Sequence, residues 1–401
     1  MKENEICTFI YIKDVSIIGV VAKLDFKTNK YNIIASAFDE IDGYINNERF
    51  LNNMSLLETR LIKLIKKLEL TSEENIVDIV LSLPDSFFIM QKFSFAHNFY
   101  FNINFDSSVL FKMKNDIWMH FNNHKNDNTL LDIEHIAYIL KNGEKVSDLK
   151  YTTGDSVKSI NLGLYLLHDI SNKLQSIMHS CNLNMKFVMP VSYGMRYGFC
   201  NLNEQNDNHL LINISSNEID FCVIGNLGVE KNGLIQFGSN FIVSQIAKEF
   251  NIDIRTAGKF FKLYLSGAGI IDYANINDVS IDKNKLKKVI FKGVEKLFML
   301  INKDIYSNGV GVTSITIDGD LKNLEFTRDI AKNIFDVPVC LAQSEQEDDF
   351  EKMKYYIMHG VIKKFMQHTK DAYQIKKYKS DITNKFCNIL NTVAVRFNSF
   401  L

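Results

Sequence analysis

The sequence predicts an α/β fold made of two similar halves with a cleft between them, and three observations support this. Three β-branched runs, a helix-period segment and an apolar strand occur near the amino terminus. The same order of segments recurs after residue 205. Between the two blocks, residues 86–162 are rich in Phe, Asn and Asp, which indicates a small inserted α+β domain. The repeated layout favours a duplicated fold, and two unrelated α/β domains are the alternative.

The first block begins with three predicted strands, because each run is rich in β-branched residues and short polar stretches separate them. They are Thr8–Ile12, Ser16–Ala22 and Tyr31–Ala35. The next segment repeats apolar residues at helical spacing, which predicts a helix with one buried face. That face comprises Leu57, Leu61, Leu64, Ile65 and Leu68. An apolar run predicts a strand at Ile76–Leu83, which Pro84 ends.

The inserted stretch contains clustered phenylalanines and two closely spaced histidines. The phenylalanines are Phe87, Phe88, Phe93, Phe95, Phe99, Phe101 and Phe105. A period of two at Phe93/Phe95 and Phe99/Phe101 favours strand cores over an exposed aromatic surface that would include Trp118. His120 and His124 lack the Glu and the third ligand of a zinc site, so we expect a solvated segment and no metal.

The chain then returns to regular α/β sequence. A strand and an amphipathic helix are expected within Gly163–Cys181, followed by a strand at Met185–Pro190. The second block has three predicted strands, two helices, a strand and a closing helix. These are His209–Ile214, Glu218–Ile224, Glu230–Gln236, Phe241–Phe250, Lys285–Asn302, Ser314–Ile317 and Leu324–Phe335.

Composition excludes several classes of protein. The chain has 46 basic and 47 acidic groups, so it lacks the basic excess of a protein that binds nucleic acid by neutralising phosphates. Six cysteines occur without a CxxC pair, which indicates buried free thiols in a reducing cytosol. The amino terminus lacks a signal-peptide layout and no window is apolar enough for a transmembrane helix, so we expect a cytoplasmic body.

Several segments of the sequence resemble those of the bacterial actin-like cell-division family FtsA. Asn161–Cys200 is similar to that family's return into its first actin-like domain, and Leu234–Phe250 to the Gly-Asn-x-x-(Thr/Ser)-x-x-Ile-Ala entry to its second. Ile357–Ile362 is similar to the closing helix. The insert lies where this family and the related pilus protein PilM carry a small extra domain. The resemblance implies a duplicated actin-like (ribonuclease H-like) fold with an inserted α+β domain and a C-terminal amphipathic helix.

The expected domain organisation follows from the resemblance and the element order. It comprises a first actin-like domain (1–85, returning at 163–205), the insert (86–162), a second actin-like domain (206–345, with a subdomain around 245–312), a closing helix (346–369), a basic linker (370–379) and an amphipathic helix (380–401).

The resemblance implies Mg-ATP as the family ligand, held by glycine-rich turns whose backbone N–H groups approach the phosphates. The first turn contains Lys13 and Asp14 but no glycine. The second turn should read Asp-x-Gly-Gly-Gly-Thr-x-Asp, yet only Asp220 matches. Asn213 replaces the opening Asp, and Ser215, Ser216 and Asn217 replace the glycines.

Two more family features are altered. The adenosine turn, Gly-Gly-Ala in the family, reads Asp318-Gly319-Asp320, which adds two carboxylates near a polyanion. The Ala-Glu-x-x-Lys helix reads Ala257-Gly258-Lys259-Phe260-Phe261, so Gly258 stands in place of the Glu and Phe261 in place of the Lys. We therefore expect nucleotide binding to be weakened or lost, with remnants of the site at Lys13, Asp14, Asn213, Ser215, Ser216, Asp220 and Gly319. No catalytic or metal-ligating residue is assigned.

The last segment predicts a membrane-binding amphipathic helix. Its apolar stripe comprises Ile382, Phe386, Ile389, Leu390, Val393, Phe397, Phe400 and Leu401. Residues 370–401 carry five Lys and one Arg against two Asp, which suits an anionic membrane surface. Packing of this helix on the protein's own core, or on a second copy, is the alternative.

Together these observations predict a divergent FtsA-like adaptor. As the resemblance implies, it would polymerise with itself, bind the FtsZ C-terminal peptide and tether the FtsZ ring to the cytoplasmic face of the inner membrane at the division site. We expect the protein to act by binding and assembly, and we expect no nucleic-acid partner. A working actin-like ATPase and a PilM-like pilus assembly scaffold are the alternatives.

Overall fold

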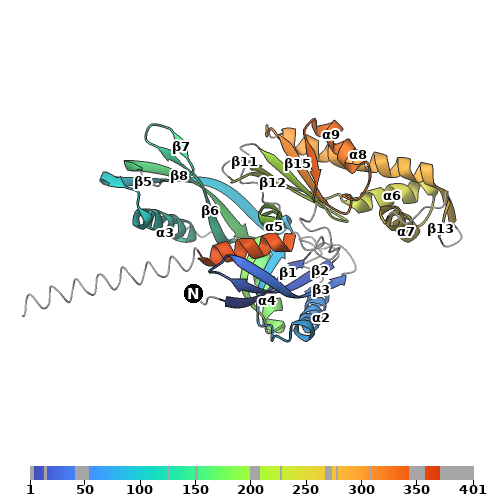
Figure 1. The fold of residues 1–401 in the computed structure, drawn as a ribbon, viewed down its shortest axis with the longest axis horizontal. Coiled ribbons are helices and arrows are strands. Elements are labelled where there is room, and N and C mark those ends of the chain that lie inside the picture. Colours follow the sequence, from blue (N-terminus) through green and yellow to red (C-terminus); the bar gives the residue numbers. More distant parts are fainter. Residues whose placement is uncertain are drawn as a thin grey trace, which may run out of the picture.

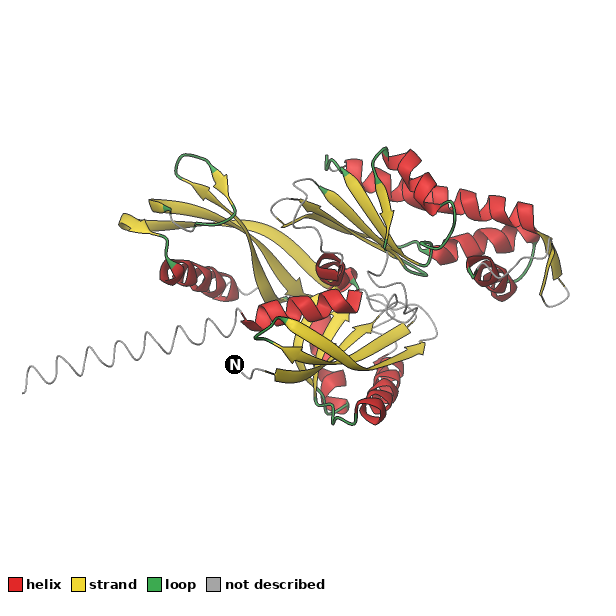
Figure 2. Ribbon diagram, in the orientation of Figure 1, coloured by secondary structure: helices red, strands yellow, loops and turns green. Residues whose placement is uncertain are grey.

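A computed structural model of the 401-residue chain shows three main sheets with helices packed against them (Figure 1). The structure describes residues 4–12, 16–40, 54–123, 127–149, 152–198, 208–225, 228–266, 273–276, 279–307, 309–342 and 357–370. Two of the sheets have five strands and the same topology, and the third has four strands. Figure 2 shows helices lying against each of these sheets.

The first five-stranded sheet follows the predicted first block. Strands β1 (Asn4–Ile12), β2 (Ser16–Asp25) and β3 (Lys30–Glu40) form an antiparallel meander. Strand β1 also pairs in parallel with β4 (Asp78–Leu83), and β4 pairs in parallel with β9 (Asn184–Pro190). The order β3-β2-β1-β4-β9 confirms the strands expected from β-branched runs.

Helices cover both faces of this sheet. Successive side chains of each strand point to opposite faces, so each face presents apolar side chains against which a helix can pack. Helix α2 (Met54–Ser72) packs on β2 and β3, and its five predicted apolar residues are all buried. It also contacts α4 (His168–Ser180). On the other face, the ring of Phe9 lies 5.6 Å from Phe365 in a helix over residues 357–370. This helix lies within the segment expected to be the closing helix (346–369), of which residues 346–356 lie outside the described part.

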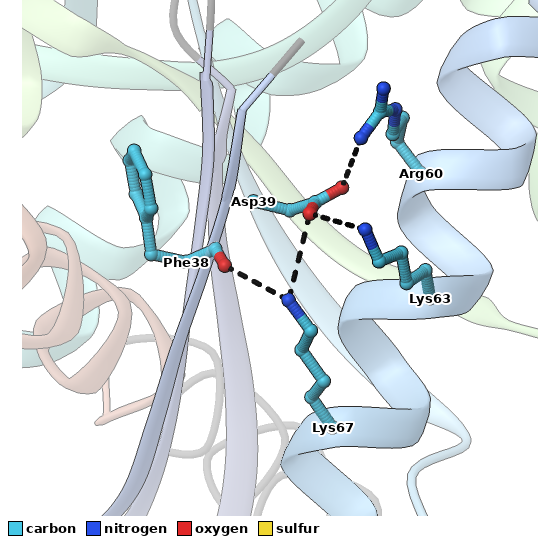
Figure 3. A network of polar contacts seen from close by, with 5 residues as sticks. All are labelled: Phe38, Asp39, Arg60, Lys63 and Lys67. Atoms are coloured by element: carbon cyan, nitrogen blue, oxygen red, sulfur yellow. Dashed lines mark hydrogen bonds and ion pairs between the residues drawn. The ribbon is translucent and has the colours of Figure 1, made fainter.

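A single carboxylate on β3 forms ion pairs with three basic side chains of α2 (Figure 3). Asp39 is buried and accepts from Lys63 Nζ at 3.0 Å and from Arg60 Nη1 at 3.3 Å. Lys67 Nζ lies 3.5 Å from the same carboxylate and also donates to the Phe38 carbonyl. The cationic partners lower the pKa of Asp39 against the opposing effect of its burial, so it stays ionised at neutral pH.

The second five-stranded sheet repeats the first. Strands β10 (His209–Ile214), β11 (Ile219–Gly225) and β12 (Gly228–Ile235) form an antiparallel meander. Strand β10 pairs in parallel with β15 (Ser314–Gly319), which pairs in parallel with β16 (Val339–Leu341). The order β12-β11-β10-β15-β16 matches that of the first sheet and confirms the predicted duplication.

Four helices pack beside the second sheet around one apolar core. Helices α6 (Ser239–Phe250) and α8 (Lys283–Ser307) were predicted, and α9 (Thr327–Phe335) is shorter than the predicted segment. Helix α7 (Ile254–Leu265) contains the Ala257-Gly258-Lys259 segment. A small hairpin, β13 (Tyr273–Ile276) with β14 (Val279–Asp282), was not predicted from the sequence.

The four-stranded sheet has the order β5-β8-β6-β7. A single 3-10 turn (Asp85–Phe87) leads into it from β4. Its strands are β5 (Phe88–Asn104), β6 (Thr129–Leu140), β7 (Lys145–Val146) and β8 (Thr153–Leu166), and helix α3 (Ser107–Asn123) packs against it. Strand β8 runs through the expected boundary at residue 162, since its last residues pair with both β5 and β6. The segment expected to begin the return is therefore the end of this sheet's central strand.

The aromatic prediction for this region was partly wrong. Phe87, Phe88 and Phe105 are buried, but Phe101 is 80% exposed and Tyr100 fully exposed where β5 leaves its register with β8. His120 lies on helix α3 and is exposed, as expected of a solvated segment, and its ring centroid is 5.2 Å from that of Phe95. His124 lies outside the described residues. Among the described cysteines, Cys7 and Cys222 are buried free thiols as expected, Cys181 is partly buried and Cys340 is exposed.

Helix α5 (Val191–Gly198) lies between the two five-stranded sheets. It contacts β4 and β9 of the first sheet and β10 and β11 of the second. It crosses the closing helix where two glycines meet, because a Cβ on Gly360 would collide with the carbonyl oxygen of Gly194. No helix of the described residues is long and apolar enough to cross a membrane.

Candidate functional site

A row of three polar side chains crosses the second sheet at the carboxyl ends of β10 and β15. Asn213 lies directly opposite Asp220 on β11 and opposite Asp318 on β15, so the three share one face. All three are buried. Lys322 pairs with Asp318 at 2.6 Å. The neutral amide of Asn213 separates two carboxylates, which avoids three adjacent negative charges.

The turn after Asn213 is closed against the start of helix α6. Ser215 N donates to Glu218 O within the turn at 2.9 Å. The carbonyl oxygens of Ser215 and Ser216 accept from Ser239 N at 2.9 Å and Asn240 N at 2.7 Å. Gly238 is required at this contact, because a Cβ there would collide with the backbone of the turn. The first amides of α6 are therefore satisfied by the turn itself.

The loop after β15 places a carboxylate on the same turn. Gly319 has φ of +96° and lies against the Ile214 backbone, which leaves no room for a side chain. The next residue, Asp320, donates its N–H to Ile214 O at 2.8 Å. Asp320 Oδ2 accepts from Ser239 Oγ at 2.6 Å and from Ser216 Oγ at 3.3 Å. The structure thus brings together the predicted remnants of the second phosphate turn (Asn213, Ser215, Ser216 and Asp220) and of the adenosine turn (Gly319).

A second feature, which the sequence prediction missed, is a groove of about 370 Å³ between α6 and α8. The residues that line it are Phe241, Gln245, Glu249, Lys285, Lys288, Val289, Lys292, Gly293 and Lys296. Gly293 lets α6 approach closely, since a Cβ there would lie 2.8 Å from Ile242 Cγ1. The four lysines recur at helical spacing along one face of α8, and this spacing was the signal available in the sequence.

The cations of the groove differ in their partners. Lys285 pairs with Glu249 at 3.0 Å and lies over the Phe250 ring, while Lys296 lies 5.0 Å from the Phe241 ring centroid. Lys288 and Lys292 are exposed and form no ion pair with any described residue. An apolar floor beneath unpaired ammonium groups can bind a segment that combines an apolar side chain with carboxylates.

Comparison with known proteins identifies the architecture. No protein-family model and no curated protein matches the sequence. Among solved structures, the chain is similar to a PilM–PilN complex of type IV pilus biogenesis, with a TM-score of 0.60 at 10% identity over 89% of this chain and 97% of that one. The chain has the actin-like fold. The duplicated actin-like part of the expected fold class is therefore confirmed.

Two further structures share this actin-like fold. The ethanolamine utilization protein EutJ from Carboxydothermus hydrogenoformans has a TM-score of 0.51 at 8% identity over 89% of each chain. MreB 5 of Spiroplasma citri, bound to AMPPNP, has a TM-score of 0.50 at 12% identity over 92% of this chain and 99% of that one. At these identities the likeness extends to the fold alone.

The residues at the turns do not fit the Mg-ATP that the actin-like fold implies. Side chains replace the glycines at Ser215, Ser216 and Asn217, and the turn is hydrogen-bonded to α6. The hydroxyls of Ser216 and Ser239 could donate hydrogen bonds to a bound anion, but they already donate to the carboxylate of Asp320. A phosphate brought here would meet that carboxylate, and like charges in contact are destabilising. The described residues include no group of three or more His, Cys, Asp or Glu that could hold a metal ion.

Other predicted site residues lie elsewhere. Lys13 and Asp14 follow β1 in the sequence and lie outside the described residues, as do all eight predicted membrane-binding residues. Ala257 is buried in the core of the second half. Among the described residues, the structure therefore brings together the second-half remnants of the expected nucleotide site.

Proposed function

We propose that this chain is an actin-like assembly scaffold that binds a partner protein segment and works without nucleotide turnover. The observation that carries this proposal is the groove between α6 and α8, with its apolar floor and the unpaired Lys288 and Lys292. Surface cations without partners attract an acidic segment and orient it, while the floor buries an apolar side chain. The closed phosphate turn supports the absence of turnover.

The biological setting that we infer is cell division, as an adaptor similar to FtsA. This setting is supported by the three sequence segments that resemble FtsA, Asn161–Cys200, Leu234–Phe250 and Ile357–Ile362. The basic, amphipathic pattern of residues 370–401 supports it as well. In this proposal the α6–α8 groove receives the FtsZ C-terminal peptide. The chain would polymerise and tether the FtsZ ring to the cytoplasmic face of the inner membrane.

A PilM-like scaffold in pilus assembly is the second candidate. The observation that favours it is the similarity to the PilM–PilN complex, whose TM-score of 0.60 exceeds that of EutJ and MreB 5. Both candidates bind a partner segment on an actin-like body. They differ in the identity of that segment, which a binding experiment can distinguish.

The test is the affinity of the purified full chain for a labelled FtsZ C-terminal peptide, measured by fluorescence anisotropy with a PilN segment as comparison. We expect the double variant Lys288→Glu/Lys292→Glu to weaken FtsZ-peptide binding by about tenfold or more, because two attractive charges become repulsive. Lys303→Glu changes the charge of the same helix outside the groove and should bind like the parent. Binding that the groove variant leaves unchanged would contradict the proposal, and selective binding of the PilN segment would favour the second candidate.

A further inference from the structure

We propose that Asp320 is a resident anion, whose carboxylate takes the place of a bound phosphate and permanently joins the turn after β10, the start of α6 and the loop after β15. This proposal goes beyond the partner-binding function. It concerns how the second half stays assembled in the absence of nucleotide.

The coordination of the carboxylate is that of a bound anion. Two hydroxyl groups from different elements, Ser239 Oγ and Ser216 Oγ, donate to the same oxygen of Asp320. Ser239 is only 3% exposed, so its hydroxyl is directed at this carboxylate from within the structure. Hydrogen bonds to an ionised acceptor are stronger than neutral ones, particularly when they are shielded from water.

The first turn of α6 is also an electrostatically favourable place for a negative charge. Gly238 precedes the helix and has no side chain to cap it. The positive end of a helix dipole is stabilised by an anion within the first turn. Asp320 supplies that charge through the Ser239 hydroxyl, although it comes from a distant part of the sequence.

The backbone fixes Asp320 in this position. Its N–H donates to Ile214 O, and Gly319 packs against the same residue in a left-handed conformation. The neighbouring Asp318 is paired with Lys322 and does not compete for the hydroxyls. Three segments that are far apart in sequence are therefore joined by one side chain.

The test is chemical rescue in the full chain, followed by thermal unfolding. Asp320→Gly removes the carboxylate and leaves a space of its size, so we expect a melting temperature about 2–4 °C below the parent's. Millimolar acetate, and separately inorganic phosphate, should restore part of this loss relative to chloride at equal ionic strength. The parent should not respond to either anion. Asp329→Asn removes a carboxylate elsewhere in the second half and should also show no anion response.

Each outcome bears on the proposal. Parent-like melting of Asp320→Gly, no rescue by either anion, or equal stabilisation of parent and variant would overturn it. If the glycine variant fails to fold, Asp320→Asn removes the charge and keeps the shape, so it should melt below the parent and, because it leaves no space for an anion, show no rescue; parent-like melting of this variant would likewise overturn the proposal. Peptide binding in the α6–α8 groove, measured on these variants, reports on the proposed function separately.

Discussion

At the scale of residues, the replacement of glycines by Ser215, Ser216 and Asn217 changes which atoms line the turn after β10. Comparison of the sequence with the FtsA pattern indicated that the glycines of this turn were missing. It did not indicate that Ser216 and Ser239 would share a carboxylate, because Ser239 and Asp320 are 81 residues apart. The loss of a phosphate turn could be predicted from sequence, whereas the internal ligand required the packing of α6 against the turn.

A second residue-scale feature is a buried histidine in the four-stranded sheet. His97 is 5% exposed and its Nε2 lies 3.2 Å from Ser159 Oγ. Burial lowers the pKa of His97 to about 4, and the nearby Asp116 only partly opposes this. The neutral ring is therefore favoured in the folded state, while an unfolded histidine titrates near pH 6.5.

The expected consequence is a loss of stability as the pH falls from 6.5 toward 4. In that range the unfolded chain binds a proton that the folded chain does not, so His97 contributes a slope of up to about 1.4 kcal/mol per pH unit. Urea unfolding at several pH values should show a shallower decline in His97→Gln than in the parent. Identical slopes in the two proteins would contradict the assignment.

At the scale of elements, the strands and most helices were predictable because their hydrophobic patterns are strong. The two meanders are rich in β-branched residues, and α2 repeats leucines on one face. Strand β8 continues past the expected boundary at 162, and its last residues resemble the start of a new unit in the sequence. The α6–α8 groove was missed because it needs two helices to meet, although the lysine spacing on α8 was visible.

The crossing of α5 with the closing helix gives an element-scale prediction. Gly360→Ala should force the two helices apart, since its Cβ has no space beside the Gly194 carbonyl, and should destabilise the fold by about 1–3 kcal/mol. Gly258→Ala is the matched control in helix α7, where the Cβ would meet only Val243 at 3.9 Å. That control should stabilise by about 0.5–1 kcal/mol through helix propensity. Denaturant unfolding that ranks the variants in the opposite order would refute the packing argument.

The C-terminal segment 380–401 lies outside the described residues, so the membrane role proposed for it rests on the sequence pattern alone. Phe397→Glu places a charge in the middle of the apolar stripe and should abolish sedimentation with anionic liposomes. The circular dichroism spectrum and melting temperature should stay those of the parent. A variant that unfolds, or that still binds vesicles, would instead indicate a helix packed on the protein's own core.

At the scale of the whole molecule, two sheets of identical topology and a four-stranded insert form an actin-like body whose second-half phosphate turn is closed by its own side chains. If the turn is permanently ligated, assembly has no nucleotide switch. In the proposed function, the groove between α6 and α8 would recruit the partner, and many weak contacts in a filament would strengthen one another by avidity.

The most direct test of this account is electron microscopy of the full chain on an anionic lipid monolayer, with and without Mg-ATP. We expect the same filaments in both conditions, because side chains replace the glycines of the turn after β10 and the hydroxyls of Ser216 and Ser239 already donate to Asp320. Filaments that form only with Mg-ATP would contradict the nucleotide-independent mechanism. Absence of filaments in both conditions would contradict the assembly role.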